Sequence, residues 1–205
     1  MTTTTEDQIL LMDIPMPIET PRLILRPVQT GDGAAITEAK RETWDQLTQW
    51  MPWAKGEHSP DADEVWARKN HAQFILRENF ALVGIEKDTG RHVIWTGLHR
   101  FDWHKRRFEI GYWVRASAQG KGYATESTNA LIRYAFNALS ARRVEITHAD
   151  GNERSQNVIE KLSFQKEAEK ALDLELPNGT FVTRHDYVRL NTDGLPPLDV
   201  RWGAP

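Results

Sequence analysis

Cysteine is absent from this chain of 205 residues. Its absence excludes disulfide bonds, zinc sites built on thiolates and catalysis by a cysteine nucleophile, and it fits a reducing compartment. A strong excess of charge is also missing, because 26 Lys and Arg stand against 29 Asp and Glu, for a net charge of -3. This balance predicts no electrostatic attraction to nucleic acid or to anionic membranes.

Long apolar runs are missing as well. No run approaches the roughly 20 residues that a helix needs to span a bilayer, and the chain starts Met-Thr-Thr-Thr-Thr-Glu-Asp, without the basic start of a secretory signal. The seven histidines show no zinc spacing, so no metal site is expected. We therefore expect a cytoplasmic protein that binds neither nucleic acid nor membranes.

With 205 residues, of which 40% are apolar, the chain is long enough for one well-buried core and short for two. We expect one domain over residues 18–190, an N-terminal arm over 1–17 and a C-terminal tail over 191–205. Patterning within the domain predicts strands at 20–28, 80–86, 92–99, 108–114, 143–148, 172–176 and 180–190, and helices at 32–50, 59–76, 120–138 and 152–162. Because three strands follow one another before residue 120, this order indicates a mixed, mostly antiparallel sheet and not a doubly wound one.

The most informative stretch runs from Phe108 to Phe136. Phe-Glu-Ile-Gly-Tyr-Trp-Val at 108–114 is rich in aromatic and β-branched residues and predicts a strand, and Gln-Gly-Lys-Gly-Tyr-Ala-Thr at 119–125 leads from it into a helix. Two glycines allow a tight turn, and the first-turn amides and dipole of the helix favour an anion. The stretch therefore predicts a site for a phosphate-bearing ligand.

Three interpretations of the glycine loop compete. A Walker A loop is not supplied, because the spacing of its glycines and its Lys-Ser/Thr pair is wrong. The dinucleotide-binding pattern Gly-x-Gly-x-x-Gly matches at Gly120 and Gly122, but Thr125 stands in place of its third glycine. Glu145 follows at about the sequence separation expected for the acidic residue that binds the ribose. A plain turn before a helix is the third interpretation, and two glycines alone do not exclude it.

Further residues resemble the GNAT superfamily of acetyl-CoA-dependent N-acetyltransferases. Gln119, Gly122 and Ala124 stand where the family's loop has Gln/Arg-x-x-Gly-x-Gly/Ala, and 109–114 is similar to its fourth strand. Asn152-Glu-Arg-Ser-Gln-Asn-Val-Ile-Glu-Lys-Leu-Ser-Phe164 resembles its Asn-x-x-Ser helix, with Ser163 in place of the usual glycine. Thr20-Pro-Arg-Leu-Ile-Leu-Arg-Pro and Trp50-Met-Pro-Trp53 resemble the branch that acetylates the N-termini of ribosomal proteins.

The resemblance covers roughly residues 18–190 and implies a single α+β domain, with helices on both faces of a twisted, mixed sheet. It implies transfer of an acetyl group from acetyl-CoA to a primary amine by direct attack in a ternary complex. The implied acceptor is the N-terminal α-amine of a protein such as a ribosomal protein. A small amine (amino acid, polyamine or antibiotic) is the alternative acceptor, and a non-catalytic acyl-CoA-binding regulatory module is the alternative class. We expect a monomer or a homodimer.

The resemblance also implies how acetyl-CoA is bound. Its pantetheine arm would lie along the backbone of Tyr112, Trp113 and Val114. Lys121 either neutralises a phosphate or is a solvated loop lysine, and Asn152 either orients the pantetheine or caps its helix. The residues expected to bind the cofactor are Tyr112, Trp113, Val114, Gln119, Gly120, Lys121, Gly122, Tyr123, Ala124, Thr125, Asn152 and Asn157.

Three residues are implied in catalysis. Glu109, at a position where several relatives carry glutamate, is the first candidate for the general base, and Glu175 is its rival. Ser155 matches a serine thought to act at the sulfur of the leaving group, whereas Ile159 occupies the place of a tyrosine acid found in many relatives. On the acceptor side we expect an apolar wall made of Trp50, Trp53 and Trp103.

Overall fold

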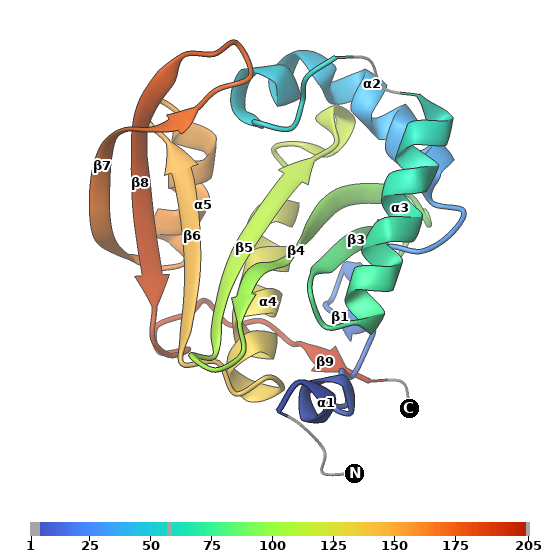
Figure 1. Ribbon diagram of the computed structural model, residues 1–205, viewed down its shortest axis with the longest axis vertical. Coiled ribbons are helices and arrows are strands. Elements are labelled where there is room, and N and C mark those ends of the chain that lie inside the picture. Colours follow the sequence, from blue (N-terminus) through green and yellow to red (C-terminus); the bar gives the residue numbers. More distant parts are fainter. Residues whose placement is uncertain (1–4, 57–58, 204–205) are drawn as a thin grey trace.

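The computed structural model describes residues 5–56 and 59–203 and contains one nine-stranded sheet in the order β7-β8-β6-β5-β4-β3-β2-β1-β9 (Figure 1). The strands are β1 Ile18–Glu19, β2 Leu23–Pro27, β3 Phe80–Glu86, β4 His92–Asp102, β5 Arg107–Val114, β6 Arg143–Ala149, β7 Gln165–Glu175, β8 Phe181–Arg189 and β9 Arg201–Trp202. The helices are α1 Thr5–Leu10, α2 Gly33–Trp50, α3 Pro60–Ile75, α4 Tyr123–Asn137 and α5 Glu153–Lys161. None of the helices in these two ranges is both long and apolar enough to cross a membrane.

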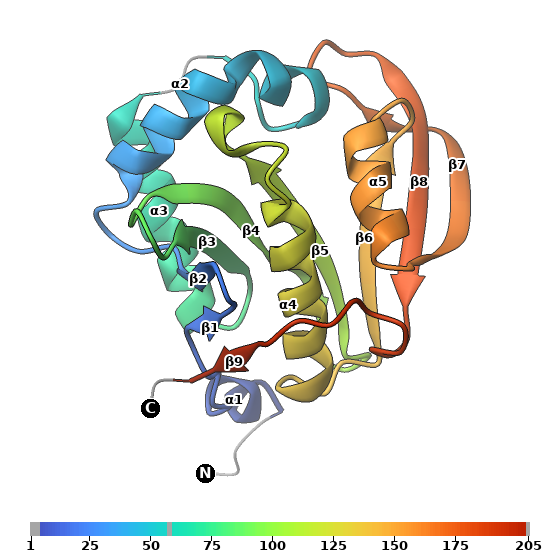
Figure 2. The same cartoon turned by 180° about the vertical axis from the view of Figure 1, so that it is seen from behind.

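Helices cover both faces of the sheet, as predicted. α2 and α3 pack on one face, where Ile36, Ala39 and Ala67 meet strand residues such as Val83. α4 and α5 lie on the other face, above the larger part of the core (Figure 2). The predicted α+β class, the mostly antiparallel sheet and the order of its central elements are confirmed.

Two segments differ from their expected outlines. β7 begins at Gln165, seven residues before the predicted strand, and most of its side chains are exposed. It is an edge strand without a buried face over most of its length, so its sequence lacks the alternation that marks a half-buried strand. The segment after residue 190 crosses α4 and ends in β9, which pairs with β1 (Figure 2).

The parallel pair β5/β6 creates the opening on which the site depends. Its register joins only Arg107–Glu109 to Arg143–Glu145, and the two strands diverge beyond those residues (Figure 1). β5 remains paired with β4 as far as Val114. The second half of β5 therefore has one paired edge and one open edge.

The backbones of β3 and β4 approach closely at Gly97. A Cβ added at Gly97 would lie 2.0 Å from the carbonyl oxygen of Phe80, on the neighbouring strand. Gly97 also pairs with Gly111 of β5, so this contact supports the strand that borders the opening. Only glycine fits there without a shift of the backbone.

We predict that Gly97→Ala lowers the free energy of unfolding by about 3 kcal/mol, because overpacking against backbone is not relieved by a side-chain rotation. Gly90→Ala is the control: Gly90 has φ +68° and a Cβ added there would meet nothing within 4 Å, so we expect a cost of only about 1 kcal/mol. Denaturant unfolding of both variants measures the difference. Equal losses would contradict the steric argument.

Candidate active site

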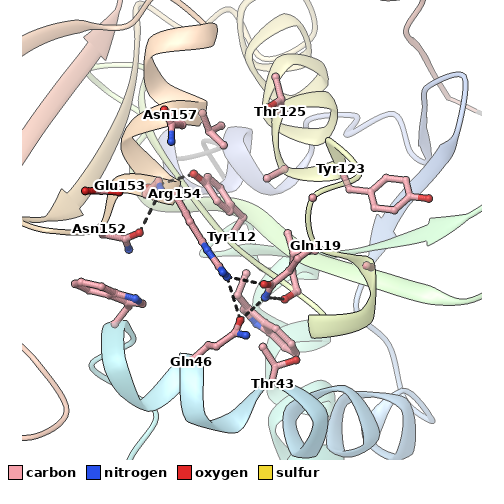
Figure 3. Close-up of a pocket in the computed structure, with 18 of the residues that line it drawn as sticks. Thr43, Gln46, Tyr112, Gln119, Tyr123, Thr125, Asn152, Glu153, Arg154 and Asn157 are labelled. Atoms are coloured by element: carbon pink, nitrogen blue, oxygen red, sulfur yellow. Dashed lines mark hydrogen bonds between the residues drawn. The ribbon is translucent and has the colours of Figure 1, made fainter.

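The main cavity lies beside the open edge of β5 and encloses about 710 Å³ (Figure 3). Its walls are the last two turns of α2 with the residue that follows, the end of β5, the glycine loop with the first turn of α4, and one side of α5 with the two residues before it. Because β5 and β6 have separated here, backbone groups on this edge of β5 are not used by the sheet. An extended ligand can pair with such an edge as an added strand would.

The side chains at the end of β5 alternate between two environments. Trp113 stacks on Trp95 with ring centroids 4.3 Å apart and an interplanar angle of 6°, and Trp53 is tilted against it at 6.4 Å. Tyr112 directs its hydroxyl toward α5, where it lies 3.1 Å from Ser155 Oγ. The strand is thus fixed on both sides, and its open edge keeps a defined position.

The glycine loop has the geometry that an anion site requires. Gly120 and Gly122 have φ values of +75° and +84°, and α4 begins directly after Gly122. A Cβ at Gly120 would meet nothing within 4 Å, so the backbone there is open to a ligand. The loop and the first turn of α4 line the cavity. The backbone N–H groups of that turn and the helix dipole favour negative charge there.

The start of the loop is held by α2. The Glu42 carboxylate accepts the backbone N–H of Ser117, and Thr43 Oγ1 accepts that of Ala116 at 3.0 Å. Burial opposes the charge on Glu42, but hydrogen bonds from Ser117 and from Arg115 lower the pKa of its carboxyl to about 2. Glu42 is therefore ionised throughout the physiological range.

The end of the loop is held through the buried carboxylate of Glu126, in the first turn of α4. It accepts the Thr20 hydroxyl at 2.6 Å, the Arg22 backbone N–H at 3.2 Å and Arg22 Nε at 2.6 Å. Arg22 also donates to the carbonyl oxygen of Lys121 at 2.9 Å, and its guanidinium lies 4.7 Å from the centre of the Tyr123 ring. The Thr20-Pro-Arg segment thus positions the loop.

A polar bridge crosses the cavity between three elements (Figure 3). Arg154 of α5 donates to Gln119 Oε1 at 2.6 Å, and Gln119 Nε2 donates both to Gln46 of α2 and to the Val114 carbonyl, the latter at 3.1 Å. With Lys161, Arg154 brings positive charge to the lining. A phosphate-bearing ligand is favoured by this charge.

Most of the residues expected at the site line the main cavity together. Asn152 is the N-cap of α5, with its side-chain oxygen accepting the Ser155 backbone N–H at 3.2 Å. Lys121 lies outside the lining, with an exposed side chain, as in the solvated alternative. The expected residues that line the cavity are Trp50, Tyr112, Trp113, Val114, Gln119, Gly120, Gly122, Tyr123, Ala124, Thr125, Asn152, Ser155 and Asn157.

The two candidate bases lie outside this lining. Glu109 is on the paired part of β5, and its carboxylate contacts Arg100 with both oxygens at 3.0 Å. Glu175, at the end of β7, forms a 3.2 Å ion pair with Lys55, with both side chains about half exposed. That pair joins β7 to the loop after α2, whose first residue, Met51, lines the cavity.

Two of the expected acceptor-side tryptophans are also not part of the lining. Trp103 packs edge-on against Phe80, Phe101 and Phe108, and its Nε1 donates to the Arg77 carbonyl, so it belongs to the aromatic part of the core. Trp53 is half exposed beside the cavity, with Lys40 5.3 Å above its ring.

The dinucleotide interpretation fails on position. Glu145, the expected ribose ligand, is buried outside the main cavity in ion pairs with Arg107 and Arg143. The sheet is also not the doubly wound one that this interpretation requires.

Sequence reasoning missed several lining residues, among them Thr43, Gln46, Arg154 and Lys161. A signal existed for α2, because Thr43, Gln46 and Gln49 repeat at a spacing of three beside Leu47 and Trp50. A polar stripe on an amphipathic helix ordinarily faces solvent. That this one faces the cavity is decided by the tertiary packing of α2, which the sequence alone does not show.

Comparison with known proteins decides the family. The model of the acetyltransferase (GNAT) domain matches residues 22–165, which is more than half of the chain. The chain belongs to the GNAT acetyltransferase family. It is therefore an N-acetyltransferase that uses acetyl-CoA, as the motifs predicted.

Individual relatives agree with this assignment. The chain is 32% identical over 169 residues to YdaF of Bacillus subtilis (strain 168), provisionally named a ribosomal N-acetyltransferase, with 81% of this chain and 88% of YdaF covered. Two solved structures share the fold at lower identity. The ribosomal-protein-S5-alanine acetyltransferase of Vibrio fischeri has a TM-score of 0.77 at 21% identity, and the match covers 90% of this chain and 100% of that one. RimL, a ribosomal L7/L12 α-N-protein acetyltransferase in complex with coenzyme A, has a TM-score of 0.79 at 19% identity, and the match covers 84% of this chain and 96% of RimL.

We predict that Arg22→Gln raises the KM for acetyl-CoA about five- to tenfold, because a charge-assisted hydrogen bond to the loop is lost and Glu126 loses its cation. Arg26→Gln is the matched control. Arg26 lies on β2, four residues after Arg22, and pairs with Asp32, remote from the loop, so its loss should lower stability but not change this KM. Steady-state kinetics and thermal unfolding separate the two effects, and a changed KM in both variants would refute a specific role of Arg22.

Proposed function

We propose that this enzyme acetylates the N-terminal α-amino group of a polypeptide, such as a ribosomal protein, in the cytoplasm. The observation that carries the proposal is the shortage of carboxylates at the reacting end of the cavity. In the described part of the chain, the lining contains a single carboxylate, Glu153, and Figure 3 shows it directed away from the cavity. The acceptor must then reach the site with an amine that loses its proton easily.

Amine pKa values favour an α-amine. An α-amino group has a pKa near 8 and a lysine side chain near 10.4, so at pH 7.5 about a quarter of the former but only about 0.1% of the latter is neutral. Because no carboxylate of the lining points into the cavity to deprotonate the ammonium form before attack, this difference passes directly into the rate. An α-amine therefore suits the cavity better than a lysine or a polyamine.

The reaction we propose is a direct transfer. The neutral nitrogen attacks the thioester carbonyl carbon, the carbon–sulfur bond breaks, and its electron pair remains on the sulfur of coenzyme A. The Ser155 hydroxyl, which lines the cavity, donates a hydrogen bond to that sulfur. The nitrogen loses its extra proton through water, and we propose Glu175 as the acceptor in preference to Glu109, because Glu175 is tied to the loop that follows α2.

The choice of a ribosomal protein as acceptor has separate support. YdaF and the two solved structures carry names that refer to ribosomal or ribosomal-protein acetylation. The Trp50-Met-Pro-Trp53 segment adds an aromatic wall beside the cavity, with Trp50 in the lining and Trp53 next to it. A small-molecule amine is the second candidate acceptor, and the same experiment tests it.

We predict that a peptide with a free N-terminus is acetylated at least tenfold faster at pH 7.5 than the same peptide blocked at its N-terminus and carrying an internal lysine, or than a polyamine. Its kcat/KM should rise with pH up to the pKa of the α-amine and then stay level to pH 10. Tyr112 should cause no fall there, because burial raises the pKa of its hydroxyl to about 12 and it stays neutral. Preference for the polyamine would overturn the proposed acceptor.

A second prediction concerns the base. Glu175→Gln should lower kcat/KM for the peptide about tenfold or more, since removal of a general base typically costs at least that. Lys55→Gln breaks the same ion pair but keeps the carboxylate, so it should retain activity. Glu109→Gln should lower the melting temperature and leave kcat/KM within a factor of two. Loss of activity in Glu109→Gln and not in Glu175→Gln would assign the base to Glu109 instead.

A further inference from the structure

The hydroxyl groups of Tyr112 and Ser155 form a hydrogen bond between two walls of the main cavity. Their oxygens lie 3.1 Å apart, with Tyr112 on β5 and Ser155 in the first turn of α5. Both residues line the cavity, and Figure 3 shows Tyr112 there. The bond therefore joins the strand and the helix on the two sides of the point where β5 and β6 have diverged.

Each side of this pair is independently fixed. The Ser155 backbone N–H donates to the Asn152 side chain, which holds the first turn of α5. β5 is held by its pairing with β4, including a hydrogen bond from Thr96 Oγ1 to the Gly111 carbonyl at 3.0 Å. The meeting of the two hydroxyls is thus a consequence of fixed backbone positions, and it restricts the rotamer of Ser155.

The direction of the hydrogen bond follows from the chemistry of the two groups. A phenol that is largely removed from water keeps its proton, since burial raises the pKa of Tyr112 to about 12, and its O–H needs an acceptor. Ser155 Oγ is the acceptor that the structure offers it. When Tyr112 donates, the Ser155 hydrogen is free to point elsewhere. When Ser155 donates instead, the phenol O–H has no acceptor among the described residues and is left to water in the cavity.

We propose that Tyr112 is a positioning residue for Ser155: by donating to Ser155 Oγ, its hydroxyl directs the Ser155 hydrogen into the cavity, toward the sulfur of the departing coenzyme A. The proposal rests on the role given to Ser155 under the proposed function. Tyr112 keeps its proton throughout. The carbon–sulfur bond breaks and the sulfur keeps the electron pair. Ser155 stabilises the negative charge on the sulfur by donating a hydrogen bond to it, and that bond is stronger because Ser155 Oγ accepts a hydrogen bond from Tyr112.

The test uses single-turnover acetyl transfer to whichever amine the wild-type enzyme acetylates, with acetyl-CoA affinity measured separately. We expect Tyr112→Phe to slow transfer about tenfold, in keeping with a misdirected hydrogen bond, and to change the affinity less than twofold. We expect Ser155→Ala to slow transfer more, and the double variant to match Ser155→Ala alone, because Tyr112 acts only through Ser155.

Tyr134→Phe is the matched control. The Tyr134 hydroxyl is also buried, lies on α4 outside the cavity and has no hydrogen-bond partner among the described residues, so its removal should leave transfer unchanged. Thermal unfolding verifies that each variant is folded. Should Tyr112→Phe prove unstable, Ser155→Thr is the second variant: it keeps the hydroxyl that accepts from Tyr112 and should retain most of the rate, whereas a loss as large as that of Ser155→Ala would count against the proposal.

Three results would overturn the proposal: an unchanged rate in Tyr112→Phe, losses that multiply in the double variant, or a raised acetyl-CoA dissociation constant that accounts for the slower rate. The comparison does not depend on the acceptor. If the wild-type enzyme prefers a small amine to a peptide, the proposed acceptor fails, and the Tyr112 variants are compared with that amine in the same way.

Discussion

The short parallel pairing of β5 and β6 is the constraint on which the rest of the structure depends. Parallel strands need a crossover connection, and here that connection is the glycine loop and α4. Because the two strands run the same way, α4 after β5 and α5 after β6 both begin at the same edge of the sheet. Two helix N-termini and one open strand edge therefore meet at the point where the strands diverge, and all three favour binding a ligand that is extended at one end and anionic at the other.

Glycine gives the loop its conformation but not its rigidity, which comes from polar contacts at both ends. Glu42 and Thr43 hold its start, whereas Thr20 and Arg22 hold its end through Glu126. A buried carboxylate near a phosphate site would repel the ligand if it were alone. Arg22 pairs with the Glu126 carboxylate and cancels its charge, and the same guanidinium donates to the Lys121 carbonyl. Arg22 therefore serves both the stability and the geometry of the site.

Patterns that are local in the sequence predicted most of the fold, and the loop motif predicted the cofactor side of the site. What escaped prediction is long-range. The Tyr112–Ser155 bond spans 43 residues and the Arg22–Glu126 pair 104, and no periodicity encodes either partner. Glu109 illustrates the same limit: its partner Arg100 lies in an irregular part of the β4/β5 register with φ +49°, so a strand pattern alone could not show that its carboxylate is already paired.

The acceptor side is built differently from the cofactor side. On the side where we propose that the acceptor enters, the cavity is lined by the end of α2 and by Met51, and the ion pair of Lys55 and Glu175 joins the loop after α2 to the far end of β7. Both side chains are about half exposed, and an exposed pair contributes little to stability because water and salt screen it. Separating the loop from β7 therefore costs little, whereas moving the doubly anchored glycine loop costs much more. A rigid cofactor side facing a weakly tied loop suits the acceptor that we propose, because a polypeptide terminus could enter without moving the glycine loop.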